Sequence, residues 1–211
     1  MAEVNPENAP ARIAVHEIGH ALAALAAARA HNRPLIILSA VGAVRSAGAG
    51  WWRELVAQAS KDIPDQGAEW ILDCGDEPGM ALAAAQAHNR PITILSAVGA
   101  VRAAGAGWWR ELVTQAQAGA PTQAAEWVLD CGDEPGMALA ALREGVQTIA
   151  LDAGEPIWSR VAQIATQCDA RVVRIDRAGA LDLANSNNPQ RDCDLYLSPP
   201  PGGVAKPGVV G

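Results

Sequence analysis

The stretch HNRPLIILSAVGAVRSAGAGWWRELVAQASKDIPDQGAEWILDCGDEPGMALAA, residues 31–84, decides the fold, because it recurs without a gap at residues 88–141. The two copies lie 57 positions apart and differ at eleven positions, most of them in the loops that begin at Ser60 and Gln117. Within each copy, apolar runs alternate with Gly-rich and amphipathic segments. This order predicts a strand, a helix, a second strand and a second helix.

The first copy illustrates the prediction. Pro34–Ser39 is a short apolar run rich in β-branched residues, which is typical of a strand buried on both faces. The Gly-rich segment Gly42–Gly50 leads into a helix at Trp51–Ala59, and Glu69–Asp73 is a second strand. A helix then begins near Pro78, where the missing N–H is harmless in the first turn. The same elements are expected at Pro91–Ser96, Trp108–Gln117, Glu126–Asp130 and Pro135–Arg143, followed by a strand at Thr148–Leu151, a helix at Pro156–Gln167 and a strand at Arg171–Ile175.

Strands that alternate with helices at this spacing are typical of parallel βα units. We therefore predict an α/β fold with a parallel sheet of repeated βα units, arranged as a doubly wound open sheet. The alternative is a small (βα)8-like barrel, for which Ile13–Val15 and Leu195–Leu197 would complete eight strands. The expected organisation is a polar N-terminal arm at 1–10, one α/β domain at 11–197 and a Pro/Gly-rich tail at 198–211.

Composition narrows the classes of partner. The formal net charge is -7, so we expect neither nucleic acid nor an anionic membrane surface as a partner. The polar N-terminus does not resemble a secretion signal, and the apolar run Ala21–Ala30 is too short to span a bilayer. The four cysteines form no CxxC pair, which favours a reducing compartment and a cytoplasmic protein.

The sharpest chemical motif is His-Glu-Ile-Gly-His at residues 16–20, which matches the HExxH pattern of zinc metallopeptidases. On a helix, residues four apart face the same way, so His16 and His20 could hold one Zn²⁺ while Glu17 polarises its bound water. The run HEIGHALAAL resembles segments of the membrane-embedded site-2 protease family and of AAA-coupled zinc proteases. That resemblance implies metal ligands at His16 and His20 and a catalytic general base at Glu17. The cofactor would be zinc, and a third protein ligand would still be needed.

A second interpretation treats the same residues as a diverged copy of the repeat. Glu17-Ile-Gly-His-Ala-Leu-Ala-Ala aligns with Glu77-Pro-Gly-Met-Ala-Leu-Ala-Ala and with the equivalent run from Glu134. His16 then stands where Asp76 and Asp133 stand, and Ile13–Val15 is a strand that precedes the helix. Ligands of open parallel sheets bind beyond the carboxyl ends of the strands, so a site there is compatible with both interpretations.

The remaining candidate sites lie where predicted strands lead into helices. Asp76 and Asp133 could bind a hydroxyl group or Mg²⁺, or they or the neighbouring Glu77 could cap a helix. Glycines and one arginine in each Gly-rich segment could cradle an anion, although a plain flexible connection fits equally well. These residues are Arg45, Gly48 and Gly50, with Arg102, Gly105 and Gly107 in the second copy.

Adjacent tryptophans, Trp51-Trp52 and Trp108-Trp109, point about 100° apart on a helix, so one of each pair should be buried and the other should lie at a rim. We expect Cys74 to be inert and His31 and His88 to be surface residues. The leading interpretation is a small-molecule-binding or anion-binding α/β domain. The alternatives are a zinc-dependent hydrolase and a homo-oligomeric scaffold that associates through Trp-rich surfaces.

Overall fold

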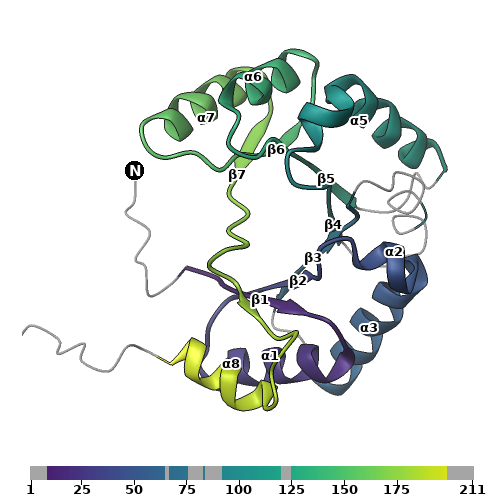
Figure 1. Cartoon of the computed structure of the whole chain (residues 1–211), viewed down its shortest axis with the longest axis vertical. Helices are drawn as coiled ribbons and strands as arrows, with labels where there is room; N and C mark the ends of the chain where they lie inside the picture. Colours follow the sequence, from purple (N-terminus) through teal and green to yellow (C-terminus); the bar gives the residue numbers. More distant parts are fainter. Residues whose placement is uncertain (1–8, 65–66, 76–82, 84–91, 120–124, 199–211) are drawn as a thin grey trace, which may run out of the picture.

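The computed structural model describes residues 9–64, 67–75, 83, 92–119 and 125–198, which include eight strands and seven helices. Helices lie between most successive strands, but none lies between the last two (Figure 1). The strands are β1 Ala11–Val15, β2 Leu35–Ser39, β3 Glu69–Asp73, β4 Ile92–Leu95, β5 Ala125–Asp130, β6 Thr148–Ala150, β7 Arg171–Val173 and β8 Leu181–Asp182. The helices are α1 Ile18–Ala30, α2 Ala43–Ala47, α3 Ala49–Asp62, α5 Ala100–Gly119, α6 Pro135–Arg143, α7 Ile157–Gln167 and α8 Pro189–Leu197.

All described strand pairs are parallel, and the sheet order is β7-β6-β5-β4-β3-β2-β1-β8. This confirms the predicted α/β class with repeated βα units. The order follows the chain without the reversal that a doubly wound sheet requires, so the arrangement is the barrel alternative. The sheet curls with its helices on the outside (Figure 1). No described hydrogen bonds join β7 to β8. The result is an incompletely closed (βα)8-like barrel.

Strands with two buried faces explain why the predicted runs are continuously apolar. All five residues of β2 are buried. The outer faces of the strands pack with the helices in one large cluster that includes Ile37, Leu72 and Leu129. The inner faces form a second, smaller cluster of Ile36, Leu38, Ile71, Leu95, Val128 and Ala150. Each strand therefore contributes side chains to two cores, which explains why its residues are apolar at consecutive rather than alternate positions.

Charged groups lie at the amino ends of the strands, where Glu69 and Arg171 are exposed and Glu126 is partly buried. A cavity of about 150 Å³ inside the curl is bordered by Ile71 and Val128 and also by Glu69. Glu126 forms an ion pair with Arg171 there. Burial and the neighbouring Glu126 raise the pKa of Glu69. The inner apolar cluster thus lies between this charged layer and the polar carboxyl edge described below.

The Gly-rich segments are mostly helical rather than loops. In the first copy, α2 and α3 meet at Gly48, whose φ of +82° interrupts the helix. In the second copy, Gly105 interrupts α5 in the same way with a φ of +79°. A positive φ is accessible to glycine at little cost, so these residues serve as kinks between two helical segments. The expectation of an irregular segment from Gly42 to Gly50 is corrected accordingly.

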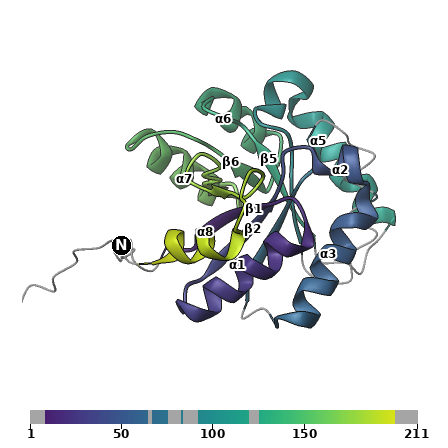
Figure 2. The same cartoon turned by 60° about the horizontal axis from the view of Figure 1, so that its bottom comes forward.

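The C-terminal part corrects the predicted eighth strand. Leu195–Leu197, expected to be a strand, ends α8, whereas the eighth strand is β8. The helix begins with Pro189, and the side chain of Asn188 accepts a hydrogen bond from the Arg191 N–H at 3.1 Å. Cys193 and Leu197, four residues apart, are both buried, and α8 packs against α1 (Figure 2). Among the described helices, none is long and apolar enough to cross a membrane.

The tryptophan pairs divide as predicted. Trp52 and Trp109 are 0% and 2% exposed, whereas Trp51 and Trp108 are only partly buried. Each buried ring meets the tryptophan of the following strand edge-on, with centroids 5.8 Å apart for Trp52–Trp70 and 5.9 Å apart for Trp109–Trp127. These contacts lock each helix to its neighbouring strand.

Replacement of Trp52 or Trp109 by Ala should each lower the free energy of unfolding by about 3 to 5 kcal/mol, because a large cavity remains in the outer core. Trp51→Ala and Trp108→Ala are the matched controls, and each should cost about 1 kcal/mol. Urea unfolding followed by circular dichroism measures the difference. Equal losses for the two members of either pair would contradict the packing described here.

Candidate functional site

Polar side chains gather at the carboxyl ends of the strands. Parallel strands all end at the same edge of a sheet, so residues at these ends come together even when they are far apart in the sequence. Ser39 ends β2, Asp73 ends β3, Ser96 follows β4 and Asp130 ends β5. The four are buried, with exposed fractions between 1% and 5%. This edge is therefore the candidate site.

In the first copy, Ser39 and Asp73 form one hydrogen-bonded unit. The Ser39 Oγ accepts from the Asp73 backbone N–H at 2.9 Å and donates to the carbonyl of Ala40 at 3.0 Å. The Asp73 Oδ1 accepts from the backbone N–H groups of Gly42 at 3.3 Å and Gly75 at 2.9 Å. Backbone donors therefore fix one carboxylate oxygen and leave Oδ2 to other partners.

The second copy repeats this unit 57 residues later. The Ser96 Oγ accepts from the Asp130 N–H at 2.8 Å and donates to the carbonyl of Ala97 at 3.2 Å. The Asp130 Oδ1 accepts from the N–H groups of Gly99 at 3.1 Å and Gly132 at 2.7 Å. Gly75 and Gly132 have φ values of +58° and +56°, so the turn after each strand requires glycine. The duplication thus produces two equivalent carboxylate sites on one edge.

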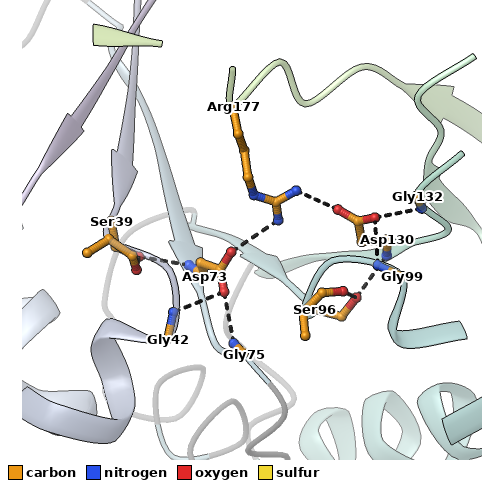
Figure 3. A network of polar contacts seen from close by, with 11 residues as sticks. Ser39, Gly42, Asp73, Gly75, Ser96, Gly99, Asp130, Gly132 and Arg177 are labelled. Carbon is orange, nitrogen blue, oxygen red and sulfur yellow. Dashed lines mark hydrogen bonds and ion pairs between the residues drawn. The ribbon is translucent and has the colours of Figure 1, made fainter. Parts of the chain in front are cut away.

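One arginine joins the two sites (Figure 3). The Arg177 Nη1 donates to Asp130 Oδ2 at 2.6 Å, and its Nη2 donates to Asp73 Oδ2 at 3.1 Å. Arg177 lies in the segment that connects β7 to β8, and its side chain is 23% exposed. The charges at this point sum to -1, because two carboxylates face one guanidinium.

Burial raises the pKa of Asp73, and Arg177 together with the Gly75 and Gly42 N–H groups opposes that rise. The net effect of burial and partners is that the folded protein holds the Asp73 proton more tightly than the unfolded chain does. Arg177 thus stabilises the Asp73 carboxylate, but it offsets only part of the free-energy cost of removing that carboxylate from water.

The cysteines beside these aspartates are poor nucleophiles. Burial, followed by the adjacent Asp73, raises the pKa of Cys74 far above its ordinary value. Burial and Asp130 raise the pKa of Cys131 to about 12. A thiol needs to ionise in order to attack, so both positions agree with the expectation of inert cysteines.

The HEIGH residues lie at a strand-to-helix junction. Strand β1 ends at Val15 and α1 begins at Ile18, so His16 precedes the helix and does not share a helical face with His20. This corrects the helical geometry on which the HExxH interpretation depends. It agrees with the interpretation of Ile13–Val15 as a strand before a βα junction.

The rings of His16 and His20 both have polar partners within the protein. The His16 Nε2 lies 2.6 Å from the Asp182 Oδ1 of β8, and the His16 backbone N–H donates to His20 Nδ1 at 3.3 Å. The His20 Nε2 lies 3.6 Å from Glu17 Oε1. Within the described part of the chain, no group of three or more His, Cys, Asp or Glu side chains is arranged to hold a metal ion. Zinc at His16 and His20, with Glu17 as a base, stays a prediction from the motif alone.

The pKa values of His20 and Asp182, two groups at this junction, are both shifted from their ordinary values. Burial lowers the pKa of His20; the carboxylates of Glu17 and Asp182 oppose this effect, and His16 adds to it. Burial disfavours ionised Asp182, but the Ala184 N–H and the His16 ring together outweigh it, so the pKa of Asp182 is lowered. The lowered pKa favours the neutral form of His20, which is the form whose Nδ1 can accept a hydrogen bond.

The predicted anion-binding residues do not converge on a single point. Gly48 and Gly105 are helix kinks, and Gly50 and Gly107 follow them inside helices. Arg102 forms an ion pair with Glu134 and lies 3.8 Å from an Asp133 oxygen, so its charge already has acidic partners. Arg45 is exposed on α2 and also has an interaction within the protein. Anion binding by these loops stays a prediction.

Other predicted residues have simple structural positions. Glu134, the equivalent of Glu77 in the second copy, is the N-cap residue of α6 and makes no side-chain capping hydrogen bond. His31 is partly exposed and lies 3.5 Å from Asp194. Asp76, Glu77 and His88 lie outside the described residues.

A cavity of about 520 Å³, here called the rim cavity, opens over the carboxyl ends of β5, β6 and β7. Asp130 and Arg177 border it, together with Asp133, Asp152, Asp176 and Arg174. Arg174 is already occupied: it donates to the Ala153 carbonyl at 2.9 Å and to Glu155 at 3.2 Å, and it lies over the Trp158 ring. The aspartates Asp133, Asp152 and Asp176 are exposed.

Comparisons with known proteins support the fold. No protein-family model matches the chain, and no curated protein matches it. Among solved structures, a fructose-1,6-biphosphate aldolase candidate from Coccidioides immitis is similar at 16% identity and a TM-score of 0.62, over 90% of this chain and 87% of that chain. The YdjI aldolase from Escherichia coli K12 is similar at 12% identity and a TM-score of 0.56, over 93% and 92% of the two chains. At these identities the likeness extends to the fold.

Sequence reasoning missed Arg177, the residue that joins the two copies. Asp73 and Asp130 had a local signal, since each ends an apolar run in front of a glycine turn. The signal for Arg177 is weaker: a single arginine in the run Arg174-Ile-Asp-Arg-Ala178, just after the last strand of the predicted series. Its importance depends on a contact across 104 residues to Asp73, which no local pattern encodes.

His20 should make the stability of the protein fall in mild acid. Its pKa in the folded protein is below the ordinary value of 6.5, so its contribution is present above that value and is lost as the pH falls through the folded pKa. His20→Gln should therefore show a smaller loss of stability between about pH 7 and pH 5. Urea unfolding over this range measures the slope. His31→Gln is the control at a more exposed histidine, and a slope reduced only by that control would contradict the assignment.

Asp73 should make the stability of the protein fall as the pH rises, which is opposite to the effect of His20. Because its folded pKa is raised, its contribution to stability is complete below the unfolded pKa of about 3.9 and decreases as the pH rises through the folded pKa. Asp73→Asn removes this titration, so the variant should lose less stability than the wild type between about pH 4 and pH 7. Thermal unfolding at fixed ionic strength tests this, with the exposed Asp169→Asn as control. Parallel curves for Asp73→Asn and the wild type would show that Asp73 does not titrate as described.

Proposed function

We propose that the carboxyl edge of this barrel binds a small polyhydroxylated molecule in the rim cavity. The observation that carries the proposal is the combination, around one cavity of about 520 Å³, of exposed carboxylates and a partly exposed guanidinium. A hydroxyl group both donates and accepts hydrogen bonds, so a polyol is able to pair with both kinds of group.

Acceptors are supplied by Asp152 and Asp176. No polar partner of the Asp152 carboxylate occurs among the residues that the structure describes, and it is exposed at the cavity border. Asp176 uses Oδ1 to accept from the Gly179 N–H at 2.7 Å, while its Oδ2 has no described partner. Both side chains can accept from ligand hydroxyls, and hydrogen bonds to a charged acceptor are the stronger kind.

A donor is supplied by Arg177. Its guanidinium has five N–H donors, and two described hydrogen bonds go to Asp73 and Asp130. The side chain is 23% exposed and borders the cavity, so the remaining N–H groups are available to a ligand oxygen. A vicinal diol could then donate to an aspartate and accept from Arg177 at the same time.

The charges around the cavity favour a neutral ligand over an anion. Four aspartates border it, while Arg174 and Arg177 are already paired with carboxylates. An anion would meet net negative charge in a partly desolvated site, where repulsion is stronger than in bulk water. Of the two ligand classes expected from the sequence, a small neutral molecule is therefore the one we propose.

The similar structures are named as aldolases, and one is named for a sugar bisphosphate, which is itself polyhydroxylated. We do not extend that chemistry to this chain. A Schiff-base route needs a lysine beside the ligand. The chain has two lysines: Lys61 lies in the last turn of α3, at the end of the helix that leads back to the start of β3, and Lys206 lies outside the described residues. Binding is thus the function we propose.

Calorimetric titration with glycerol, ribitol, sorbitol and fructose tests the proposal. At least one polyol should bind saturably, and Asp152→Asn should weaken that binding by about tenfold, as expected for loss of one charge-assisted hydrogen bond. Asp169→Asn is a matched control, because Asp169 is exposed away from the cavity and asparagine tolerates its φ of +52°. Inorganic phosphate should bind more weakly than the best polyol. Tighter phosphate binding, or no saturable binding of any polyol, would contradict the proposal.

A further inference from the structure

We propose that Asp73 and Asp130 form a two-point receptor for a guanidinium or amidinium group, and that Arg177 is its tethered occupant. The two carboxylates stand at equivalent positions of the repeat and meet at one guanidinium, each through its Oδ2 (Figure 3). A free ligand of the same chemistry would occupy the receptor when Arg177 is withdrawn.

The receptor is organised without help from Arg177. Each aspartate has its Oδ1 held by two backbone N–H groups, and its own N–H is bound by the serine of the preceding strand. These partners belong to the repeat and fix the directions of both free Oδ2 atoms. A receptor that is preorganised in this way loses little conformational freedom when a cation binds.

Arg177 comes from outside the repeat. It lies on the irregular connection between β7 and β8, and it is less buried than either aspartate, with a side chain 23% exposed against 4% and 5%. It also borders the rim cavity. A solvent guanidinium therefore has a route to the same position, and the rest of such a ligand would extend into the cavity.

The geometry selects a planar cation. Two different nitrogens of one guanidinium reach two separate carboxylates, a fork that an ammonium ion cannot reproduce with fixed directions. A hard divalent cation prefers six or more oxygen ligands, whereas the receptor offers two free oxygens whose neighbours are backbone N–H donors. The ligand class is accordingly a guanidino or amidino compound.

Chemical rescue of Arg177→Ala is the test. The probe is guanidinium chloride at up to about 50 mM, far below its denaturing range, at about pH 8. Removal of Arg177 should lower the midpoint of thermal unfolding, and guanidinium should restore at least about 4 °C of it along a saturating curve. Wild-type protein, whose receptor is filled, should show no such rise.

Three controls decide the outcome. Sodium chloride at equal concentration reports on screening, and urea reports on a neutral molecule of the same shape. The double variant R177A/D73N keeps one carboxylate and should lose most of the rescue. Equal effects of urea or sodium chloride, or full rescue of the double variant, would overturn the proposal. If Arg177→Ala does not fold, Arg177→Gln retains the side-chain stem without the charge, and absence of saturable rescue in that variant would overturn it as well.

This inference is separable from polyol binding in the rim cavity. The rescue is measured on a variant that lacks the Arg177 donor and without any polyol, whereas polyol binding is measured on the wild type. A failed rescue therefore leaves the polyol result intact, and the reverse also holds.

Discussion

The ion pairs of Arg177 with Asp73 and Asp130 are the contact on which the carboxyl edge of this barrel depends. The sheet does not close by hydrogen bonding between β7 and β8. Arg177, on the connection between those strands, instead reaches across to β3 and β5. Two buried carboxylates without a cation would be strongly unfavourable. The connection between β7 and β8 therefore has to lie where Arg177 can balance the charge of both carboxylates.

Much of the fold follows from local pattern. Continuous apolar runs such as Pro34–Ser39 predicted strands buried on both faces, and the structure uses both faces, one for the helices and one for the interior. The arrangement of the strands was harder to predict. A doubly wound sheet and a barrel contain the same βα units, and they differ in whether the chain reverses its direction of travel across the sheet. That choice depends on long-range packing, and the short β8 has too little apolar sequence to reveal itself.

In the candidate site, too, some features follow from local sequence pattern and others depend on long-range contacts. The aspartates at the ends of β3 and β5 had a local signal, since a strand, a carboxylate and a glycine turn follow one another, but the site residues predicted from the sequence were Asp76 and Asp133 instead. Their serine partners lie 34 residues earlier, one strand away, and were predicted from the sequence only as the last residues of strands. The HEIGH motif carried a strong local signal, yet its histidines meet Asp182 and each other at a strand-to-helix junction. Spacing alone did not distinguish a junction from a helix.

The shared arginine couples the two repeat copies energetically. Tandem repeat units usually interact through the packed interface between neighbouring units. Here a single guanidinium balances one carboxylate from each copy. Loss of charge at position 73 would alter the electrostatic environment of position 130, and the converse is equally true. The effects of substitutions at these two positions on stability are consequently expected to be non-additive.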